Sequence, residues 1–148
     1  MGIGLIGRIL VDTSVYIEAL RDRAFAATFR PIYERGIPRT HLSSVVAQEL
    51  LAGARTVAHR RLAQGLIEPF ERARRVVTPT HPIWCEAGLL LSQLWRDAPS
   101  FRSAIRAGLV NDVLIALTAR AIGATVLTRN RVHFEMIRRV RGVGVEIV

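Results

Sequence analysis

The stretch Ile9-Leu10-Val11-Asp12-Thr13-Ser14 indicates how this chain begins to fold. Its three apolar residues predict a buried strand, and the acid and two hydroxyl residues after them are typical of a helix start. In an open α/β sheet, ligands bind at the carboxyl ends of the strands. Asp12 is therefore the first candidate for a functional carboxylate, although an Asp here could instead cap the helix that begins at Thr13.

Strands and helices are predicted to alternate along the rest of the chain. Further strands are expected at 39–42, 75–78, 125–128 and 143–148, and helices at 13–20, 23–35, from 44 onward, 54–70, 83–95, from 101 onward and 131–139. A turn is expected at 97–100. Strands that alternate with helices predict an α/β fold, in which helices cover both faces of a mostly parallel sheet of four or five strands.

Two of these helices carry more specific predictions. The helix at 54–70 is expected to be interrupted near Gly65 and closed by Pro69. In the helix at 83–95, helical spacing groups Trp84, Leu91 and Trp95, and we expect this stripe to face the core.

Length and composition favour a single domain over residues 1–148. Half of the residues are hydrophobic, so a packed core is expected. Polar residues or Gly interrupt the longest apolar stretches before they reach the roughly 20 residues that span a bilayer, so no membrane association is predicted. The only Cys, Cys85, fits a protein of the reducing cytoplasm.

The charge is strongly positive and is carried entirely by arginine. The formal net charge is +9, and all 21 basic residues are Arg, because the chain contains no Lys. Such a charge attracts phosphate polymers or an acidic protein partner, although genome composition could equally explain the preference for Arg. The absence of Lys excludes a Walker-type phosphate loop, a Schiff-base Lys and a Ser-Lys dyad. A basic region that could follow a nucleic-acid backbone, or could simply be a solvated helix face, comprises Arg60, Arg61, Arg72, Arg74 and Arg75.

Two more carboxylates stand in apolar surroundings. Glu49 lies one helical turn from Val45 and Val46, on or beside the apolar face of its helix. An ionised carboxylate there costs several kcal/mol unless it is paired, for example with Arg, or coordinated. Asp112 interrupts the apolar run 109–117 and could cap a helix that begins at Val113.

Taken together, Asp12, Glu49 and Asp112 point to a metal site. Neighbouring carboxylates raise one another's pKa, so a cluster of ionised acids needs a cation. Oxygen ligands without Cys or grouped His favour Mg²⁺ or Mn²⁺ over Zn²⁺. Such an ion can activate water and neutralise the charge that develops on a phosphodiester.

The remaining polar residues carry weaker signals. The histidines show no metal-ligand spacing, and surface or satisfied core positions are expected for His41, His59, His81 and His133. Ser43 and Ser44 lack the G-x-S-x-G setting of a hydrolase nucleophile.

Four segments together resemble the PIN-domain family, and specifically the VapC-type toxin ribonucleases of bacterial toxin–antitoxin pairs. They occur in the family's order and are Ile9-Leu10-Val11-Asp12-Thr13-Ser14-Val15, Leu42-Ser43-Ser44-Val45-Val46-Ala47-Gln48-Glu49-Leu50-Leu51-Ala52-Gly53, Val110-Asn111-Asp112-Val113-Leu114-Ile115-Ala116 and Gly123-Ala124-Thr125-Val126-Leu127-Thr128-Arg129-Asn130.

This resemblance implies a three-layer α/β/α sandwich, endonucleolytic cleavage of RNA with Mg²⁺ or Mn²⁺, a homodimer and a cognate antitoxin protein. By position, Asp12, Glu49 and Asp112 resemble the family's metal-holding acids. Asn130 stands at or next to the position where many relatives carry a further acid, and it could orient a water or serve as a neutral ligand. His133 also stands where an acid is often found, and Glu135 is the nearest remaining carboxylate. One firmly bound ion is therefore expected.

Two other functions fit parts of the pattern. The missing acid near position 130 is compatible with a catalytically weak PIN-like module that binds RNA or protein without cutting. A phosphatase-like hydrolase with Asp12 as nucleophile fits less well, because Ser14 stands where a second Asp would be expected.

Overall fold

The computed structural model describes residues 6–97, 99 and 107–148. They contain a five-stranded sheet of order β3-β2-β1-β4-β5 in which every pairing is parallel. The strands are β1 (Arg8–Val11), β2 (Thr40–Ser43), β3 (Val76–Val77), β4 (Ala124–Thr128) and β5 (Gly144–Ile147). The predicted parallel sheet is therefore confirmed. The start of the expected helical region at Phe101 and part of the expected turn at 97–100 lie outside the described residues.

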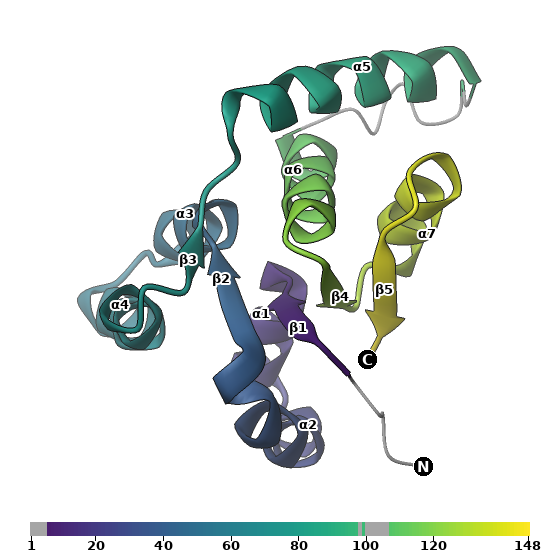
Figure 1. Cartoon of the computed structure of the whole chain (residues 1–148). Helices are drawn as coiled ribbons and strands as arrows, with labels where there is room; N and C mark the ends of the chain where they lie inside the picture. The colour runs from purple at the N-terminus through teal and green to yellow at the C-terminus, as the bar shows by residue number, and fades with distance from the viewer. Residues whose placement is uncertain (1–5, 98, 100–106) are drawn as a thin grey trace.

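The helices pack as two groups. They are α1 (Thr13–Arg21), α2 (Arg23–Gly36), α3 (Ser44–Gly53), α4 (Val57–Arg72), α5 (His81–Asp97), α6 (Ala107–Ala121) and α7 (Arg131–Val140), with a 3₁₀ turn, η1, at Ile37–Arg39. Within the first group α1 contacts α2 and α3, and in the second α6 contacts α5 and α7. Right-handed crossovers place α1–α4 on one face of the sheet and α5–α7 on the other (Figure 1). The result is the α/β/α sandwich that the resemblance implied.

The core lies around the two central strands. Leu10, Val11 and Val126 are fully buried on β1 and β4, as expected for parallel strands covered by helices on both faces. Helix α6 is almost entirely buried from Leu109 to Ala119, which explains why its sequence is apolar on every side. Gly123, with a φ of 65°, turns the chain from α6 into β4.

The strand order creates a switch point between β1 and β4. From β1 the chain moves outward to β2 and β3, and it then returns to the opposite side of β1 to form β4. In open α/β sheets, ligands bind in the crevice outside the carboxyl ends of the strands at such a point. Asp12 directly follows β1, so it stands at this position.

Two predictions about the helices are wrong. Helix α4 continues without a break from Val57 to Arg72, with Gly65 and Pro69 inside it. Pro69 costs the helix one hydrogen bond, and only three residues follow it before the helix ends. On α5, Trp84 and Trp95 are 53% and 47% exposed, and of the predicted stripe only Leu91 packs against the core. The buried residues of this helix are Ile83, Ala87, Leu90 and Leu94. Both stripes have helical spacing, so periodicity alone did not identify the one that packs on α6.

None of the helices in the described residues combines the length and the apolar character that crossing a membrane requires.

Candidate active site

Asp12 occupies the N-cap position of α1, but its side chain makes no capping hydrogen bond. Instead Oδ2 accepts hydrogen bonds from the hydroxyl of Ser14 at 2.5 Å and from that of Thr128 at 2.8 Å. The residue is only 2% exposed. The capping role that the sequence left open is therefore not how this carboxylate is used.

The two hydroxyl groups are held in place by backbone groups of the β4–α7 turn. The backbone N–H of Arg129 donates to Ser14 Oγ at 3.1 Å, and that of Asn130 donates to Thr128 Oγ1 at 2.9 Å. Each hydroxyl thus accepts from the backbone and is free to donate to Asp12. This arrangement fixes the orientation of the Asp12 carboxylate between β1 and β4.

Glu49 connects three helices at the same end of the sheet. Its Oε2 accepts from the hydroxyl of Thr13 at 2.5 Å, and its Oε1 accepts from the amide of Asn111 at 2.9 Å. The arginine pairing considered from the sequence is not observed among the described residues, where Glu49 forms none of the ion pairs.

Asp112 lies within α6, inside the helical region expected from 101 onward, so it does not cap a helix that begins at Val113. It is 7% exposed. Its Oδ2 accepts from the amide of Asn130 at 2.9 Å and lies 2.5 Å from Nδ1 of His133. Both contacts fall on Oδ2, and among the described residues no hydrogen bond to Oδ1 is found.

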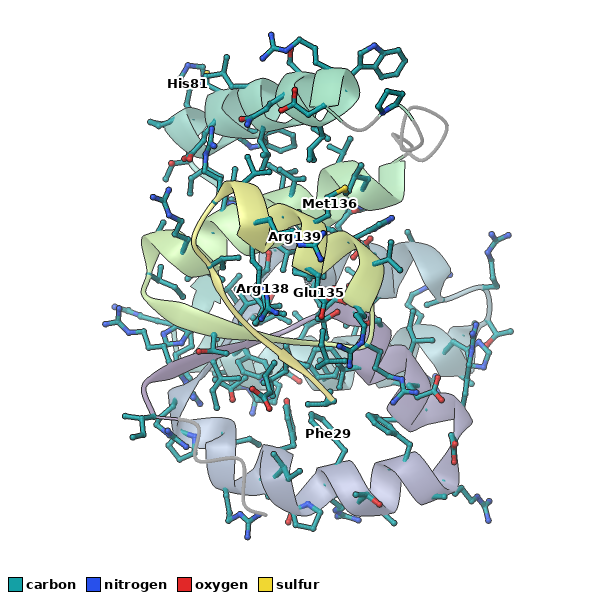
Figure 2. All side chains as sticks on the ribbon, turned by 90° about the vertical axis from the view of Figure 1, so that its right-hand side faces the viewer. Phe29, His81, Glu135, Met136, Arg138 and Arg139 are labelled. Atoms are coloured by element: carbon teal, nitrogen blue, oxygen red, sulfur yellow. The ribbon has the colours of Figure 1, made fainter. Side chains whose placement is uncertain are left out.

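Asn130 and His133 form the start of α7. Asn130 is the N-cap residue, and its side-chain oxygen accepts from the backbone N–H of His133 at 3.3 Å. The Asn130 amide nitrogen also lies 2.9 Å from His133 Nδ1. Glu135, the next carboxylate, is paired with Arg131 at 3.0 Å and Arg138 at 3.9 Å on α7, and Figure 2 labels Glu135 and Arg138 on this helix. Glu135 therefore does not replace the missing acid.

Burial and mutual repulsion shape the charges of the site. Burial raises the pKa of Asp112 to about 8, with the charges of Asp12 and Glu49 adding to the effect. Burial also raises the pKa of Asp12, against the hydrogen bonds from Ser14 and Thr128. Because Asp12, Glu49 and Asp112 act on one another electrostatically, the fold has brought the three acids into one region, as the sequence predicted.

The contact between Asp112 and His133 holds one proton in the absence of a metal. Burial lowers the pKa of His133, although the charge of Asp12 opposes the shift. Since the pKa of Asp112 is raised to about 8, the proton at neutral pH belongs to the carboxyl group and not to the imidazole. The pair is therefore a neutral hydrogen bond, donated by the Asp112 carboxyl group to His133 Nδ1, and the Asn130 amide donates to Asp112 Oδ2.

The donor atoms of this region suit a hard divalent cation, because they are mainly carboxylate oxygens that are costly to keep ionised without one. As they stand, no three His, Cys, Asp or Glu side chains in the described residues are arranged to hold an ion. The hydrogen bonds described above direct the carboxylates to Thr13, Ser14, Thr128 and Asn130. Coordination would therefore require these side chains to shift toward a common point.

Comparison with models of protein families shows which family the chain belongs to. A model of the PIN domain matches residues 9–140. The chain belongs to the PIN domain family. The family that the four sequence segments indicated is thus confirmed. No sequence among curated proteins matches this PIN domain significantly.

Solved structures share its fold. DNA-bound VapBC from Salmonella typhimurium has a TM-score of 0.69 at 22% identity, over 96% of this chain and 98% of that chain. VapBC-1 from nontypeable Haemophilus influenzae has a TM-score of 0.65 at 20% identity, over 94% and 96% of the two chains. A toxin–antitoxin complex from Klebsiella pneumoniae has a TM-score of 0.62 at 19% identity, over 93% and 95%.

Several residues of the site were missed or undervalued in the sequence. His133 was expected at the surface or in the core, Thr128 was assigned only to a strand, and no role was given to Asn111. Their partners Asp112, Asp12 and Glu49 lie 21, 116 and 62 residues away. The one local signal was the N-cap pattern, because an Asn three residues before His133 marks the start of a helix beside the site.

The five arginines of the predicted basic region do not all have the same role in the structure. Arg75 donates to the carbonyl groups of Ile37 and Thr40 and lies over the ring of Phe70, so it is part of the packed fold. Arg72 pairs with Glu68 within α4. Arg60, Arg61 and Arg74 are exposed.

Proposed function

We propose that this PIN domain is a Mg²⁺- or Mn²⁺-dependent endoribonuclease that acts as the toxin of a toxin–antitoxin pair. The observation that carries the proposal is the meeting of Asp12, Glu49 and Asp112 at the switch point between β1 and β4. Asp12 and Asp112 are almost fully buried. The charges of Asp12 and Glu49 add to the effect of burial and raise the pKa of Asp112 further. Membership of the PIN domain family supports a nuclease.

In this proposal Asp12, Glu49 and Asp112 hold the ion, and each has a partner that keeps it in place. When bound, Mg²⁺ or Mn²⁺ would activate a water and neutralise charge on the phosphodiester. Ser14 and Thr128 orient Asp12, while Thr13 and Asn111 orient Glu49. Asn130 donates to Asp112 and can position a water or a phosphate oxygen beside it.

The charge of the chain supports a polyanionic substrate. A net charge of +9 attracts a phosphate backbone. Arg131 follows Asn130 directly and has a side chain that is 64% exposed, so it can approach a phosphate near the site. The choice of RNA rests on the resemblance to VapC-type toxins, and an RNA substrate together with a single Cys favours action in the cytoplasm.

A groove beside the site supports an antitoxin partner. Two adjoining cavities, of about 410 and 390 Å³, lie among α1, α2, α3 and α4 and share Leu20 and Leu66 in their walls. Glu49 lines the second cavity, so the groove reaches the proposed active site. Arg21 and Arg30 line the cavities, which favours an amphipathic segment with acidic residues. The similar structures include VapBC complexes.

A homodimer remains part of the proposal. The exposed stripe that includes Trp84 and Trp95 on α5 offers an apolar surface for a second copy. Sedimentation analysis of the wild type and of Trp84→Glu tests this: a dimer that the substitution dissociates supports it, and a monomeric wild type contradicts it.

The nuclease is tested by incubating labelled structured RNA with Mn²⁺ and the wild type, Asp12→Asn or Asp112→Asn. Asp22→Asn is a matched control, because Asp22 caps α2 through Ala24 and Phe25, and Asn caps helices as well as Asp does. We expect cleavage by the wild type and Asp22→Asn only. RNA binding without cleavage by all four proteins, with either metal, would instead favour the non-cutting module.

A further inference from the structure

We propose that the imidazole nitrogen of His133 is a ligand of the same ion that Asp112 holds, so that the site prefers transition-metal ions such as Mn²⁺ or Co²⁺ over Mg²⁺. This inference rests on the proposed metal-dependent function and adds a nitrogen donor to its three carboxylates. It also gives His133, which stands where relatives often carry an acid, a direct role.

The first support is the convergence of two donor atoms. His133 Nδ1 and Asp112 Oδ2 are 2.5 Å apart. At this separation the oxygen and the nitrogen direct lone pairs into the same space and share a proton; when an ion displaces that proton, both atoms are close enough to bind the same ion. Because Oδ2 belongs to a proposed metal ligand, an ion bound there lies within reach of the imidazole.

The second support is the rigid placement of His133. Its backbone N–H is bound by the side chain of Asn130, which fixes the residue in the first turn of α7. The amide of Asn130 also bonds Asp112, so α6 and α7 are linked at this point. The His133 side chain is 21% exposed, which leaves the imidazole accessible to an ion from solvent.

The third support is the short chain of contacts between Asp12 and His133. Thr128 donates to Asp12 and accepts from the backbone N–H of Asn130, and the Asn130 amide nitrogen lies 2.9 Å from His133 Nδ1. His133 is therefore linked to a second proposed ligand as well as to Asp112.

The metal preference follows from the chemistry of the donors. Carboxylate oxygens suit Mg²⁺ and Mn²⁺, whereas imidazole suits later transition metals and is a poor ligand for Mg²⁺. Replacing an acid with His removes one negative charge and adds a softer donor. Affinity should therefore rise more steeply from Mg²⁺ to Mn²⁺ to Co²⁺ than carboxylate ligands alone would give, and this added preference should depend on His133.

The test uses the full chain without RNA. Pulsed electron paramagnetic resonance of bound Mn²⁺ reports directly on nitrogen in its coordination shell, and calorimetry gives the affinities for Mg²⁺, Mn²⁺ and Co²⁺. The variants are His133→Asn, which removes the imidazole, and His133→Asp, which restores an acid. His81→Asn is the matched control, because His81 stands at the start of α5, and Figure 2 shows it apart from α7.

We expect a nitrogen coupling in the wild type and in His81→Asn but not in the two His133 variants. Loss of the imidazole should lower Co²⁺ affinity by at least about tenfold, the scale of changes around metal ligands, and His133→Asp should favour Mg²⁺ over Co²⁺ relative to the wild type. Mn²⁺ binding that Asp112→Asn abolishes, but that shows no nitrogen coupling in the wild type and metal affinities that His133→Asn leaves unchanged, would overturn the role of His133 alone. Absence of metal binding by the wild type would overturn the proposed function with it.

Discussion

The hydroxyl of Thr128 donates a 2.8 Å hydrogen bond to Asp12, and this bond joins the carboxyl ends of β4 and β1. Thr128 is fully buried and also accepts from the backbone N–H of Asn130. One side chain thus orients the first acid of the site and positions the turn that carries Asn130 and His133.

Thr128→Val should therefore weaken both the fold and the site. The valine keeps the shape but removes a donor and an acceptor, so we expect a loss of about 1–3 kcal/mol in the free energy of unfolding and weaker Mn²⁺ binding. Urea unfolding and calorimetry measure the two effects. Thr128→Ser retains the hydroxyl and serves as the control; equal losses in Ser and Val variants would show that the hydrogen bonds are not the cause.

The metal-free protein should lose stability as the pH rises. The pKa of Asp112 in the folded state is raised from 3.8 to about 8, so the neutral carboxyl group favours the fold at low pH. This contribution is fully present below the unfolded value of 3.8 and is lost as the pH rises through about 8.

Asp112→Asn removes that loss, because its side chain is neutral at every pH. Relative to the wild type, the variant should become more stable as the pH increases from 5 to 8, by an amount on the order of a few kcal/mol. Chemical unfolding of both proteins in the presence of chelator checks this difference. A difference in stability that stays constant across this range would contradict the raised pKa.

Asn130→Asp should increase the affinity for Mg²⁺. The added carboxylate faces Asp112 across a contact that is 2.9 Å in the wild type, and a cation can neutralise the new repulsion. The cap of α7 should survive, because Asp is as good an N-cap as Asn. Calorimetry of the two proteins, with circular dichroism to monitor the helix, tests the prediction; unchanged or weaker Mg²⁺ binding by a folded variant would count against a metal at Asp112.

Leu20→Glu should prevent binding of the antitoxin without affecting cleavage. Leu20 is 62% exposed and lines both cavities of the groove, so a charge there opposes an apolar partner without disturbing the core. Leu89 on α5 is 68% exposed and lines neither cavity, which makes Leu89→Glu a suitable control. Copurification from native cells should recover a small partner with the wild type and Leu89→Glu only. Recovery of the same partner with Leu20→Glu would show that the antitoxin binds at a different surface.

The sequence predicted the sheet and most helices because their signals are local. An apolar run before Asp12 identified β1, a short segment before Ser43-Ser44 identified β2, and the segment after Gly123 identified β4. The helix starts at Thr13, Ser44 and Arg131 agree with the structure. The position of Trp84 was wrong because two stripes of α5 are apolar, and the choice between them depends on how α5 packs against α6.

The acids of the site were identified because their neighbours in the sequence are apolar. The side chains that contact them in the folded structure could not be predicted from sequence spacing. Asp112 falls in the helical region expected from 101 onward, but the sequence left open whether it capped a helix at Val113, and the structure places it inside α6. The contacts of Thr128 and His133 with the acids join residues far apart in the chain, so they exist only once β1, β4, α6 and α7 are assembled.

Reversible dependence of RNA cleavage on a divalent metal is the decisive property of the proposed site. Labelled structured RNA is incubated with the wild type and Mn²⁺, chelator is added in excess during the reaction, and Mn²⁺ is then restored. We expect cleavage to stop on chelation and to resume with Mn²⁺, and we expect Asp12→Asn to cleave in neither phase. Cleavage that continues in the presence of chelator, or that persists in Asp12→Asn, would contradict a metal-dependent site built on these carboxylates.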